Sequence, residues 1–351
     1  MKLLILITGT GRSGTSTMSG TLHHLGLFVP GPYLGANESN PKGFFESKWA
    51  VRFHKQVTDA AGIHEFDSRP TAFGRVQESI TDDQRRRLVA FLAEQAEQSD
   101  QVVVKDPRTV WTQELWRWAA AEAGLELRCI SMLRHPAEVV GSRATYYANP
   151  DDEVARRRYE TFNVARWVNN SIVNERETRA LPRAFVRYTD LLTDWRPVLA
   201  GLGTDLGLTY DVDVTTDAPS PVDEFIDPDL RRHRVTWDDL EVPADLQDVA
   251  QRIWDDLDVL ANSHGVDASA SADLDALSAR YDRLLADATA VSHDAIEEVR
   301  REARAAGARE ARKEAGATAP ATVADRRVGE TGSKDLLRVV AGRMRSKLHR
   351  G

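Results

Sequence analysis

The chain has 351 residues, of which 42% are hydrophobic and 28% charged, and its formal net charge is −8 at pH 7. This length suits one large α/β domain or two smaller ones, and the apolar content is sufficient for a sizeable core. Residues 300–351 carry 14 Lys/Arg and 6 Asp/Glu. The rest of the chain is therefore strongly acidic, which argues against nucleic-acid binding. The sequence contains no apolar stretch long enough to span a membrane.

The first twenty residues carry the strongest local pattern. An apolar run at residues 2–8 is followed by Gly9-Thr-Gly-Arg-Ser-Gly-Thr-Ser-Thr17 and then by a helical pattern at residues 18–25. A strand, a glycine-rich loop and a helix in this order bind phosphate, because the backbone N–H groups turn inward and the helix N-terminus is partly positive. The apolar run is too short for a signal peptide, since it leads directly into the loop.

The spacing of this loop resembles the nucleotide-binding P-loop, with four residues between Gly9 and Gly14. The P-loop lysine is absent, because Thr15 stands at its position, and Arg12 is the only cation of the loop. A P-loop-like nucleotide kinase or ATPase that depends on ATP and Mg²⁺ therefore stays an alternative that must explain Thr15. A non-catalytic nucleotide-binding scaffold is a second alternative.

The segment after the first helix is rich in proline, glycine and asparagine, so residues 28–46 are predicted to form a long loop next to the phosphate site. Glu38 and Glu46 are the carboxylates nearest to the glycine loop in sequence, and either could act as a general base. Glu46 is favoured because Phe44 and Phe45 precede it and could desolvate it. A helix is expected at residues 47–60 and irregular structure at 63–80.

Two further strands end in cations. Residues 101–105 read as a buried strand that ends at Lys105, after a capped helix at 81–98. Ligands of open α/β sheets bind at the carboxyl ends of strands, so Lys105 could stabilise negative charge on a transferring group. The next helix, 111–123, should bury one face, which is formed by Trp111, Leu115 and Trp118.

The strand at 127–133 ends at Arg134, and Pro136 suits the first turn of the following helix. Ser142 lies eight residues after Arg134 on that helix. An arginine fork and a hydroxyl at a strand–helix junction can both bond a phosphate. The single cysteine, Cys129, lies within this strand, where a buried structural thiol is expected. One cysteine forms no internal disulfide, which suits a reducing, cytoplasmic compartment.

The Arg134/Ser142 pair resembles the 3′-phosphate clamp of sulfotransferases that use 3′-phosphoadenosine 5′-phosphosulfate (PAPS). The loop form Arg-Ser-Gly-Thr-Ser is similar to their 5′-phosphosulfate-binding loop, and Lys105 is similar to the lysine that some branches place near the sulfuryl group. The resemblance covers roughly residues 1–235. It implies an α/β fold with a mostly parallel sheet flanked by helices, PAPS as the sulfuryl donor, and no metal.

Carried over residue by residue, the resemblance implies a cofactor-binding set made of the loop, the clamp and one arginine of the late basic segment 231–234. These residues are Gly11, Arg12, Ser13, Gly14, Thr15, Ser16, Thr17, Arg134, Ser142 and Arg232. Arg12 and Lys105 would stabilise the developing charge. Glu46 resembles the glutamate base of Golgi-type branches. The cytosolic branch uses a histidine where Asp106 stands here, and His135 suits a helix cap better than catalysis.

The remaining expectations concern domains and partners. A helix is predicted at 152–178, a strand at 183–188, a helix from 189 to near 207 and a loop at 222–237. The domain boundaries are a sulfotransferase-like domain at 1–265, a helical extension at 266–315, a linker at 316–333 and a basic amphipathic tail at 334–351. The tail could contact an anionic membrane surface, and a partly disordered tail is the alternative. The acceptor could be a small molecule, a carbohydrate or a glycolipid.

Overall fold

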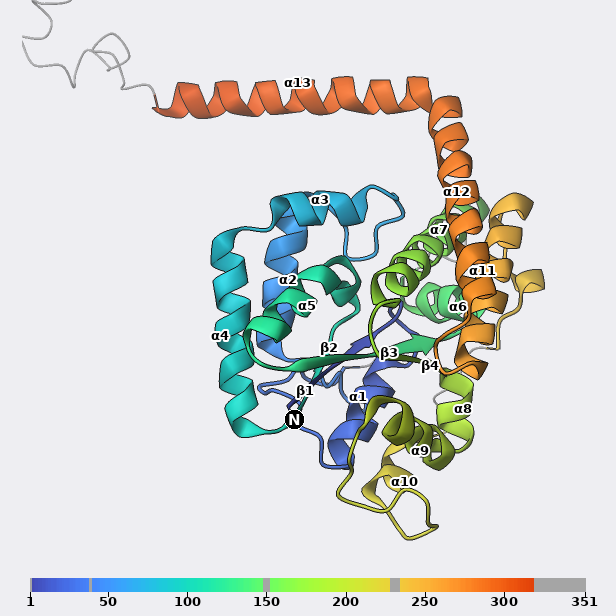
Figure 1. Ribbon diagram of the computed structural model, residues 1–351. Helices are drawn as coiled ribbons and strands as arrows, with labels where there is room; N and C mark the ends of the chain where they lie inside the picture. The colour runs from blue at the N-terminus through green and yellow to red at the C-terminus, as the bar shows by residue number, and fades with distance from the viewer. Residues whose placement is uncertain (1, 38–39, 148–151, 228–233, 319–351) are drawn as a thin grey trace, which may run out of the picture. The chain divides into compact units, whose positions relative to one another are not determined.

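The fold is built on a parallel sheet of four strands in the order β2-β1-β3-β4 (Figure 1). The structure is a computed structural model that describes residues 2–37, 40–147, 152–227 and 234–318. The strands are β1 (Leu3–Thr8), β2 (Gln101–Lys105), β3 (Glu126–Leu133) and β4 (Arg183–Arg187). The predicted α/β class with a parallel sheet flanked by helices is confirmed.

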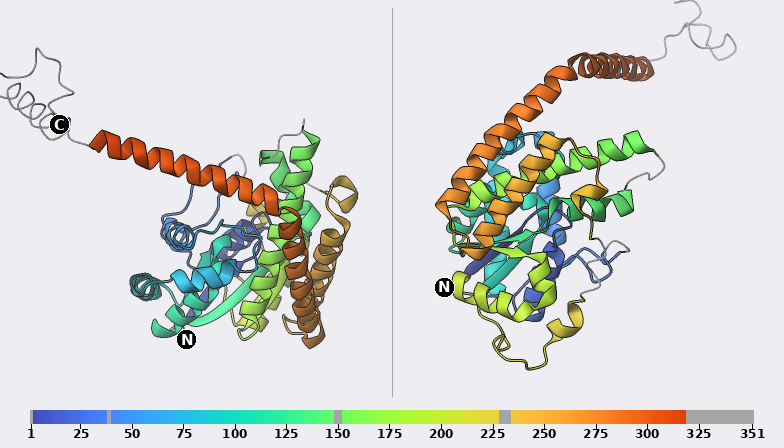
Figure 2. Two further views of the ribbon diagram at one scale, coloured as in Figure 1. Left: turned by 90° about the horizontal axis from the view of Figure 1, so that it is seen from above. Right: turned by 90° about the vertical axis from the view of Figure 1, so that its right-hand side faces the viewer.

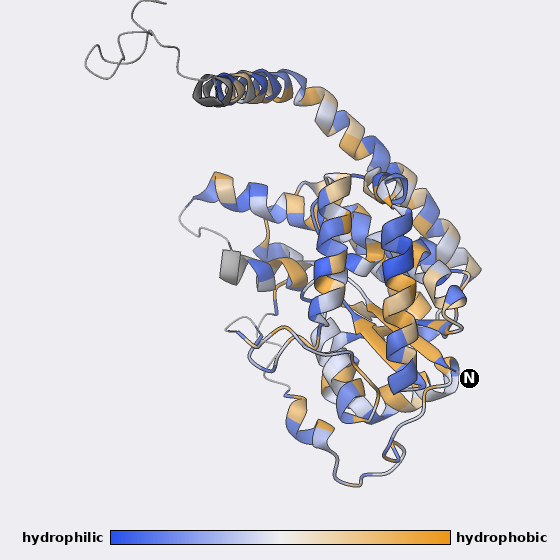
Figure 3. Cartoon of the chain, turned by 90° about the vertical axis from the view of Figure 1, so that its left-hand side faces the viewer, coloured by the Kyte–Doolittle hydropathy of each residue, from blue (hydrophilic) through white to orange (hydrophobic). Residues whose placement is uncertain are grey.

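The central strand β1 is buried along its whole length. Because successive side chains of a strand point to opposite faces, β1 contributes to two cores. Leu4 and Leu6 pack into the core on one face, whereas Leu3, Ile5 and Ile7 pack into the core on the other. Figure 3 shows the hydrophobic strands enclosed by helices of mixed polarity. Such continuous apolar runs are typical of parallel strands that are covered on both faces.

Helices cover the sheet in three groups (Figures 1 and 2). The core on the Leu4 face is completed by α2 (Lys48–Ala61), α3 (Ala72–Ser79), α4 (Asp82–Gln98) and α5 (Gln113–Glu122). The core on the Leu3 face is completed by α1 (Thr15–His24) and α9 (Trp195–Leu206). A third core beside β4 is formed by α6 (Pro136–Tyr147), α7 (Glu153–Thr178), α11 (Ala244–Asn262) and α12 (Ala268–Val291). The short elements are η1 (Pro107–Trp111), α8 (Tyr188–Thr193), α10 (Pro221–Phe225) and η3 (Trp237–Asp239).

Most predicted elements are present, with four corrections. The irregular segment 63–80 contains α3, and the single helix expected at 189–207 is two helices, α8 and α9. The helix expected at 111–123 starts at Gln113, after η1. Its apolar face holds Trp116 instead of Trp118, which is 37% exposed. The loop expected at 222–237 contains the end of α10 and the start of η3. The capped start at Thr81 is confirmed, because Thr81 and Gln84 form a reciprocal capping box.

The chain divides into two compact units, Met1–Ala286 and Asp287–Gly351. In the first unit, α12 buries Leu274, Leu277 and Tyr281 in the third core. The helical extension predicted after residue 265 is thus helical, although the domain boundary itself stays a prediction. In the second unit, α13 (His293–Thr318) is a single helix. The rest of the expected linker and the basic tail lie outside the described residues. Within the described ranges, no helix has the length and apolar character needed to cross a membrane.

Candidate functional site

A cavity of about 520 Å³ opens beside the glycine-rich loop, where β1, β2 and β3 end. The carboxyl ends of parallel strands are the usual place for a ligand in an open α/β sheet. The structure brings ten of the predicted site residues to this one cavity. They are Gly11, Arg12, Gly14, Thr15, Ser16, Thr17, Glu46, Lys105, Arg134 and Ser142. We call the wall formed by Gly11, Arg12, residues 14–17, Lys105, Arg134 and Ser142 the loop wall.

The loop itself requires a positive φ at three of its positions, the first of which is Gly9 with φ 125°. Arg12 has φ 76° although it is not a glycine, and Gly14 has φ 89°. A Cβ on Gly14 would lie only 2.1 Å from Cδ2 of Tyr188, so the loop packs directly against this ring. Glycine at position 14 is therefore required both by conformation and by space. Helix α1 starts at the next residue, Thr15, so its N-terminus faces the loop.

Ser13 has a different role from its neighbours. Its hydroxyl is 2.6 Å from Thr10 Oγ1, and its N–H donates to the Thr10 carbonyl at 3.1 Å. Ser13 is buried and does not line the cavity. Its side chain thus closes the loop on itself, and the resemblance-based assignment of Ser13 to ligand binding can apply only to its backbone.

The loop and the Arg134/Ser142 pair are in direct contact. Arg12 Nε donates to Ser142 Oγ at 3.1 Å, and Arg134 Nη1 donates to the Arg12 carbonyl at 3.0 Å. Arg134 also pairs with Glu138 at 3.0 Å, and its guanidinium lies 5.3 Å from the centre of the Tyr188 ring. Both predicted phosphate-binding motifs therefore meet in one hydrogen-bonded cluster.

Lys105 and Glu46 form a buried ion pair beside the loop, with exposures of 1% and 6%. The Lys105 ammonium contacts Glu46 Oε1 and donates to Ser16 Oγ at 2.8 Å. This geometry ties the end of β2 to the start of α1 and to the segment before α2. Burial raises the pKa of Glu46 above its ordinary value, although the Lys105 charge opposes this shift. A carboxylate with a raised pKa is suited to accept a proton near neutral pH.

Asp106 cannot play the role of Glu46. It is fully buried, does not line the cavity, and accepts bonds from His54 at 3.0 Å and from Arg108 at 2.9 Å. The Trp116 indole can only donate, and it donates to His54 Nε2 at 2.8 Å, so the imidazole proton lies on Nδ1, facing Asp106. Burial opposes the Asp106 charge, but His54 and Arg108 lower the pKa of this carboxyl to about 2. Asp106 therefore orients Arg108 by accepting its hydrogen bonds.

The other candidates lie away from the cavity or outside the described residues. His135 accepts from the Ala137 N–H at 3.3 Å and contacts Gln251 at 3.0 Å, as expected for a residue at the start of a helix. Arg234 is exposed and does not line the cavity. Glu38, Arg231 and Arg232 lie outside the described residues. Cys129 is buried as predicted, and burial raises the pKa of its thiol to about 12.

A second wall of the cavity was not predicted from the sequence, and we call it the α7 wall. It consists of His64, Glu65, Phe66, Arg143, Tyr159, Phe162, Asn163 and Arg166. The Arg143 guanidinium lies 4.1 Å from the centre of the Phe66 ring, and Arg166 lies 4.5 Å from the Phe162 ring. These residues come from the segment between α2 and α3, from α6 and from α7. Arg143 directly follows Ser142 of the predicted phosphate clamp, and this position in the sequence could have indicated that Arg143 lies near the cavity.

His64 in this wall is not suited to be a base. Its Nδ1 accepts the Phe66 N–H at 3.0 Å, so in the neutral ring the proton lies on Nε2. Burial, followed by the Arg166 charge, lowers the pKa of His64 below its ordinary value. A neutral ring with this tautomer can donate a hydrogen bond through Nε2 but cannot accept a proton there. Glu46 is therefore the better base.

A buried chain of hydrogen bonds supports the ends of the strands. Asn174 of α7 donates to Ser131 at 2.8 Å, and Gln113 donates to Asn174 at 2.6 Å. Ser131 also lies 3.1 Å from the hydroxyl of Thr8, the last residue of β1. This network joins α5, α7, β1 and β3 directly below the glycine-rich loop, so the residues at the start of the loop are held in place. In the part of the chain described, no three His, Cys, Asp or Glu side chains group as metal ligands.

No protein-family model matches the chain. A search of curated proteins gives no match. Among solved structures, the chain is similar to a sulfotransferase domain of the Synechococcus PCC 7002 olefin synthase, with TM-score 0.39, 18% identity, and coverage of 76% of this chain and 97% of that one. It is also similar to a sulfotransferase domain of the curacin biosynthetic pathway, with TM-score 0.40, 15% identity, and coverage of 74% and 98%.

Proposed function

We propose that this protein is a sulfotransferase that moves the sulfuryl group of PAPS to an acceptor hydroxyl or amine. The observation that supports this most is that one cavity contains the glycine-rich loop, Lys105 and the Arg134/Ser142 pair. These groups suit a ligand with two separate phosphate sites, because the loop offers backbone N–H groups and the pair offers a guanidinium and a hydroxyl. A kinase would need a cation at Thr15 that the loop does not supply.

The chemistry of these residues supports PAPS as the donor. The N–H groups of the loop and the N-terminus of α1 would hold the 5′-phosphosulfate, and Arg134 with Ser142 would hold the 3′-phosphate. When bound, PAPS supplies the sulfuryl group and leaves as adenosine 3′,5′-bisphosphate. Lys105 and Arg12 are placed to stabilise the charge that develops between the two groups.

Glu46 is the proposed general base. An acceptor oxygen forms the new S–O bond while the S–O bond to the 5′-phosphate breaks, and the proton of the acceptor hydroxyl passes to the Glu46 carboxylate. Because the base must be unprotonated, kcat/KM should rise with pH through the raised pKa of Glu46. The acidic limb should therefore lie above the ordinary range of a glutamate.

The experiment is PAPS turnover, measured as release of adenosine 3′,5′-bisphosphate in the presence of carbohydrate, glycolipid and phenol acceptors. We expect turnover by the wild type and about 10²- to 10⁴-fold less by Glu46→Gln, with unchanged affinity for the bisphosphate. The acidic limb of the pH profile should disappear in this variant. Tight binding of PAPS without turnover on any acceptor would favour a nucleotide-binding scaffold instead.

A further inference from the structure

The cavity contains more positive charge than its own carboxylates balance. Six Arg or Lys side chains line it, against two carboxylates among the described residues. The two carboxylates are already used, since Glu46 contacts Lys105 and Glu65 contacts Arg108. Arg143 and Arg166 have no carboxylate within ion-pair distance in the described ranges. Both belong to the α7 wall.

These two arginines are held in defined orientations without being neutralised. Arg143 lies 4.1 Å from the centre of the Phe66 ring and donates to Asn163 Oδ1 at 3.1 Å. Arg166 lies 4.5 Å from the centre of the Phe162 ring. Stacking on an aromatic ring fixes the guanidinium plane and leaves N–H groups at its edge able to bond a carboxylate or phosphate in bidentate fashion.

Holding these charges in the cavity costs free energy. Burial lowers the pKa of Arg143, and the neighbouring charges of Arg166 and Arg12 lower it further. Burial also lowers the pKa of Arg166, although the more distant Asp67 carboxylate opposes this shift. Partly buried charges without a carboxylate at ion-pair distance are unfavourable, and an anionic ligand would supply that direct partner. The free protein therefore carries a site that is preorganised for an oxyanion.

The phosphates of the donor do not require this site. In the proposed function they are met by the loop, Lys105 and the Arg134/Ser142 pair, all on the loop wall. The α7 wall adds three aromatic rings, those of Phe66, Tyr159 and Phe162, to its arginines, and these rings can contact the body of an organic molecule.

We propose that the α7 wall binds the acceptor, and that Arg143 and Arg166 select an acceptor that carries an anionic oxygen group besides its hydroxyl. A carboxylate, a phosphate ester and a sulfate ester share this chemistry. The inference rests on the proposed function for the identity of the reaction, but the anion site can be tested separately. It narrows the open acceptor classes to acidic sugars, acidic lipids and hydroxy acids.

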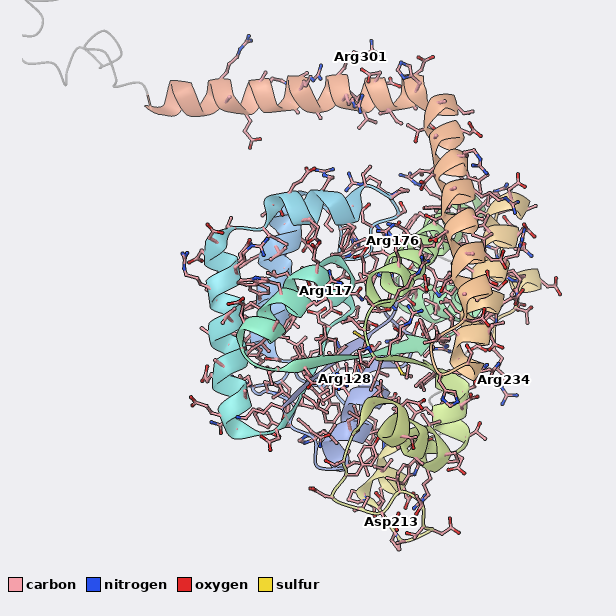
Figure 4. The ribbon with its side chains drawn as sticks, viewed as in Figure 1. Arg117, Arg128, Arg176, Asp213, Arg234 and Arg301 are labelled. Atoms are coloured by element: carbon pink, nitrogen blue, oxygen red, sulfur yellow. The ribbon has the colours of Figure 1, made fainter. Side chains whose placement is uncertain are left out.

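The test is calorimetric titration of inorganic phosphate into protein saturated with adenosine 3′,5′-bisphosphate, at constant ionic strength. We expect Arg143→Gln and Arg166→Gln each to weaken phosphate binding by about tenfold, because each removes a charge-assisted pair of bonds. Bisphosphate affinity should stay within about threefold in both variants. The matched control is Arg176→Gln. Arg176 is on the same helix, exposed and paired with Glu177 at 2.9 Å, and it should leave phosphate binding unchanged (Figure 4).

Two outcomes would overturn the inference, and a third would overturn only the proposed function. If the two variants lose bisphosphate affinity as well, Arg143 and Arg166 belong to the donor site, while the proposed function stands. If phosphate binding is unchanged in them but lost in Lys105→Met, the phosphate occupies the sulfuryl position. If the wild type does not bind the bisphosphate, the proposed function fails, and phosphate titration of the nucleotide-free protein still decides on the anion site. Thermal unfolding of each variant verifies that it is folded.

Discussion

The two walls of the cavity differ in how the chain builds them. The loop wall starts from one contiguous run, residues 11–17, to which the ends of β2 and β3 add Lys105 and Arg134. Of its cations, Lys105 and Arg134 have carboxylate partners within the fold. The α7 wall combines three distant segments, and its two arginines stack on aromatic rings instead. The loop wall suits the phosphates of the donor, and in our proposal the α7 wall suits the acceptor.

The largest effect is expected from the loop wall. Lys105→Met should lower the single-turnover rate of sulfuryl transfer by about 10²- to 10³-fold, since it removes one preorganised donor from the developing charge. The bisphosphate should still bind. Lys55→Met, which removes an exposed lysine of α2 that pairs with Asp59, is the control. A rate within about fivefold of the wild type would place Lys105 outside the reaction.

The stability that Asp106 contributes through its bonds to His54 and Arg108 should be sensitive to acid. Asp106→Asn should destabilise the protein by about 3 kcal/mol, because it breaks a buried network. The folded-state pKa of Asp106 is about 2, which is below its ordinary value. Its contribution is therefore present above the unfolded-state pKa and is lost as the pH falls to about 2. Urea unfolding at several pH values measures both effects, and Asp59→Asn, in an exposed pair, should change stability by less than about 0.5 kcal/mol. Equal losses in the two variants would contradict this account.

Substitutions of the loop glycines test how tightly the loop packs against Tyr188 and against the α7 wall. Gly14→Ala should cost about 2–4 kcal/mol, because φ is 89° and the added methyl group meets the Tyr188 ring. Gly207→Ala shares the left-handed backbone, at φ 70°, but meets nothing within 4 Å, so it should cost about 1 kcal/mol.

Gly11→Ala would meet the tip of the Phe66 ring at 2.6 Å and Arg143 Nη2 at 3.0 Å. Both contacts are with the far ends of side chains, and Gly11 does not need a positive φ, so the cost should lie below that of Gly14→Ala. Chemical denaturation measures all three variants. A larger loss of stability in Gly11→Ala than in Gly14→Ala would show that the α7 wall is more rigid than the contact between the loop and Tyr188.

The smallest effect is expected at Cys129. Burial holds its thiol at a pKa of about 12, so it should not react with a thiol reagent at neutral pH in the native state. It should react fully in urea. Rapid native labelling at pH 7 would mean that β3, which carries Arg134, opens readily.

The sequence predicted the loop wall because its chemistry lies in short motifs next to strand ends. Apolar runs located β1, β2 and β3, and a parallel sheet brings their carboxyl ends to one edge. The α7 wall could not be predicted in this way. Phe66 lies in a segment that reads as irregular, and Arg166 lies on a long polar helix whose facing side depends on tertiary packing. The inward direction of Arg143 likewise follows from Phe66 and Asn163, which are distant in sequence.

The most direct test of the central claim is calorimetric titration with adenosine 3′,5′-bisphosphate, compared with ATP and Mg²⁺, for the wild type and Arg134→Ala. We predict that the bisphosphate binds more tightly than ATP to the wild type. Its affinity should fall by about tenfold or more in the variant, because a charge-assisted phosphate contact is lost. Tighter binding of ATP, with no effect of Arg134→Ala, would contradict the account and favour a P-loop-like kinase or ATPase.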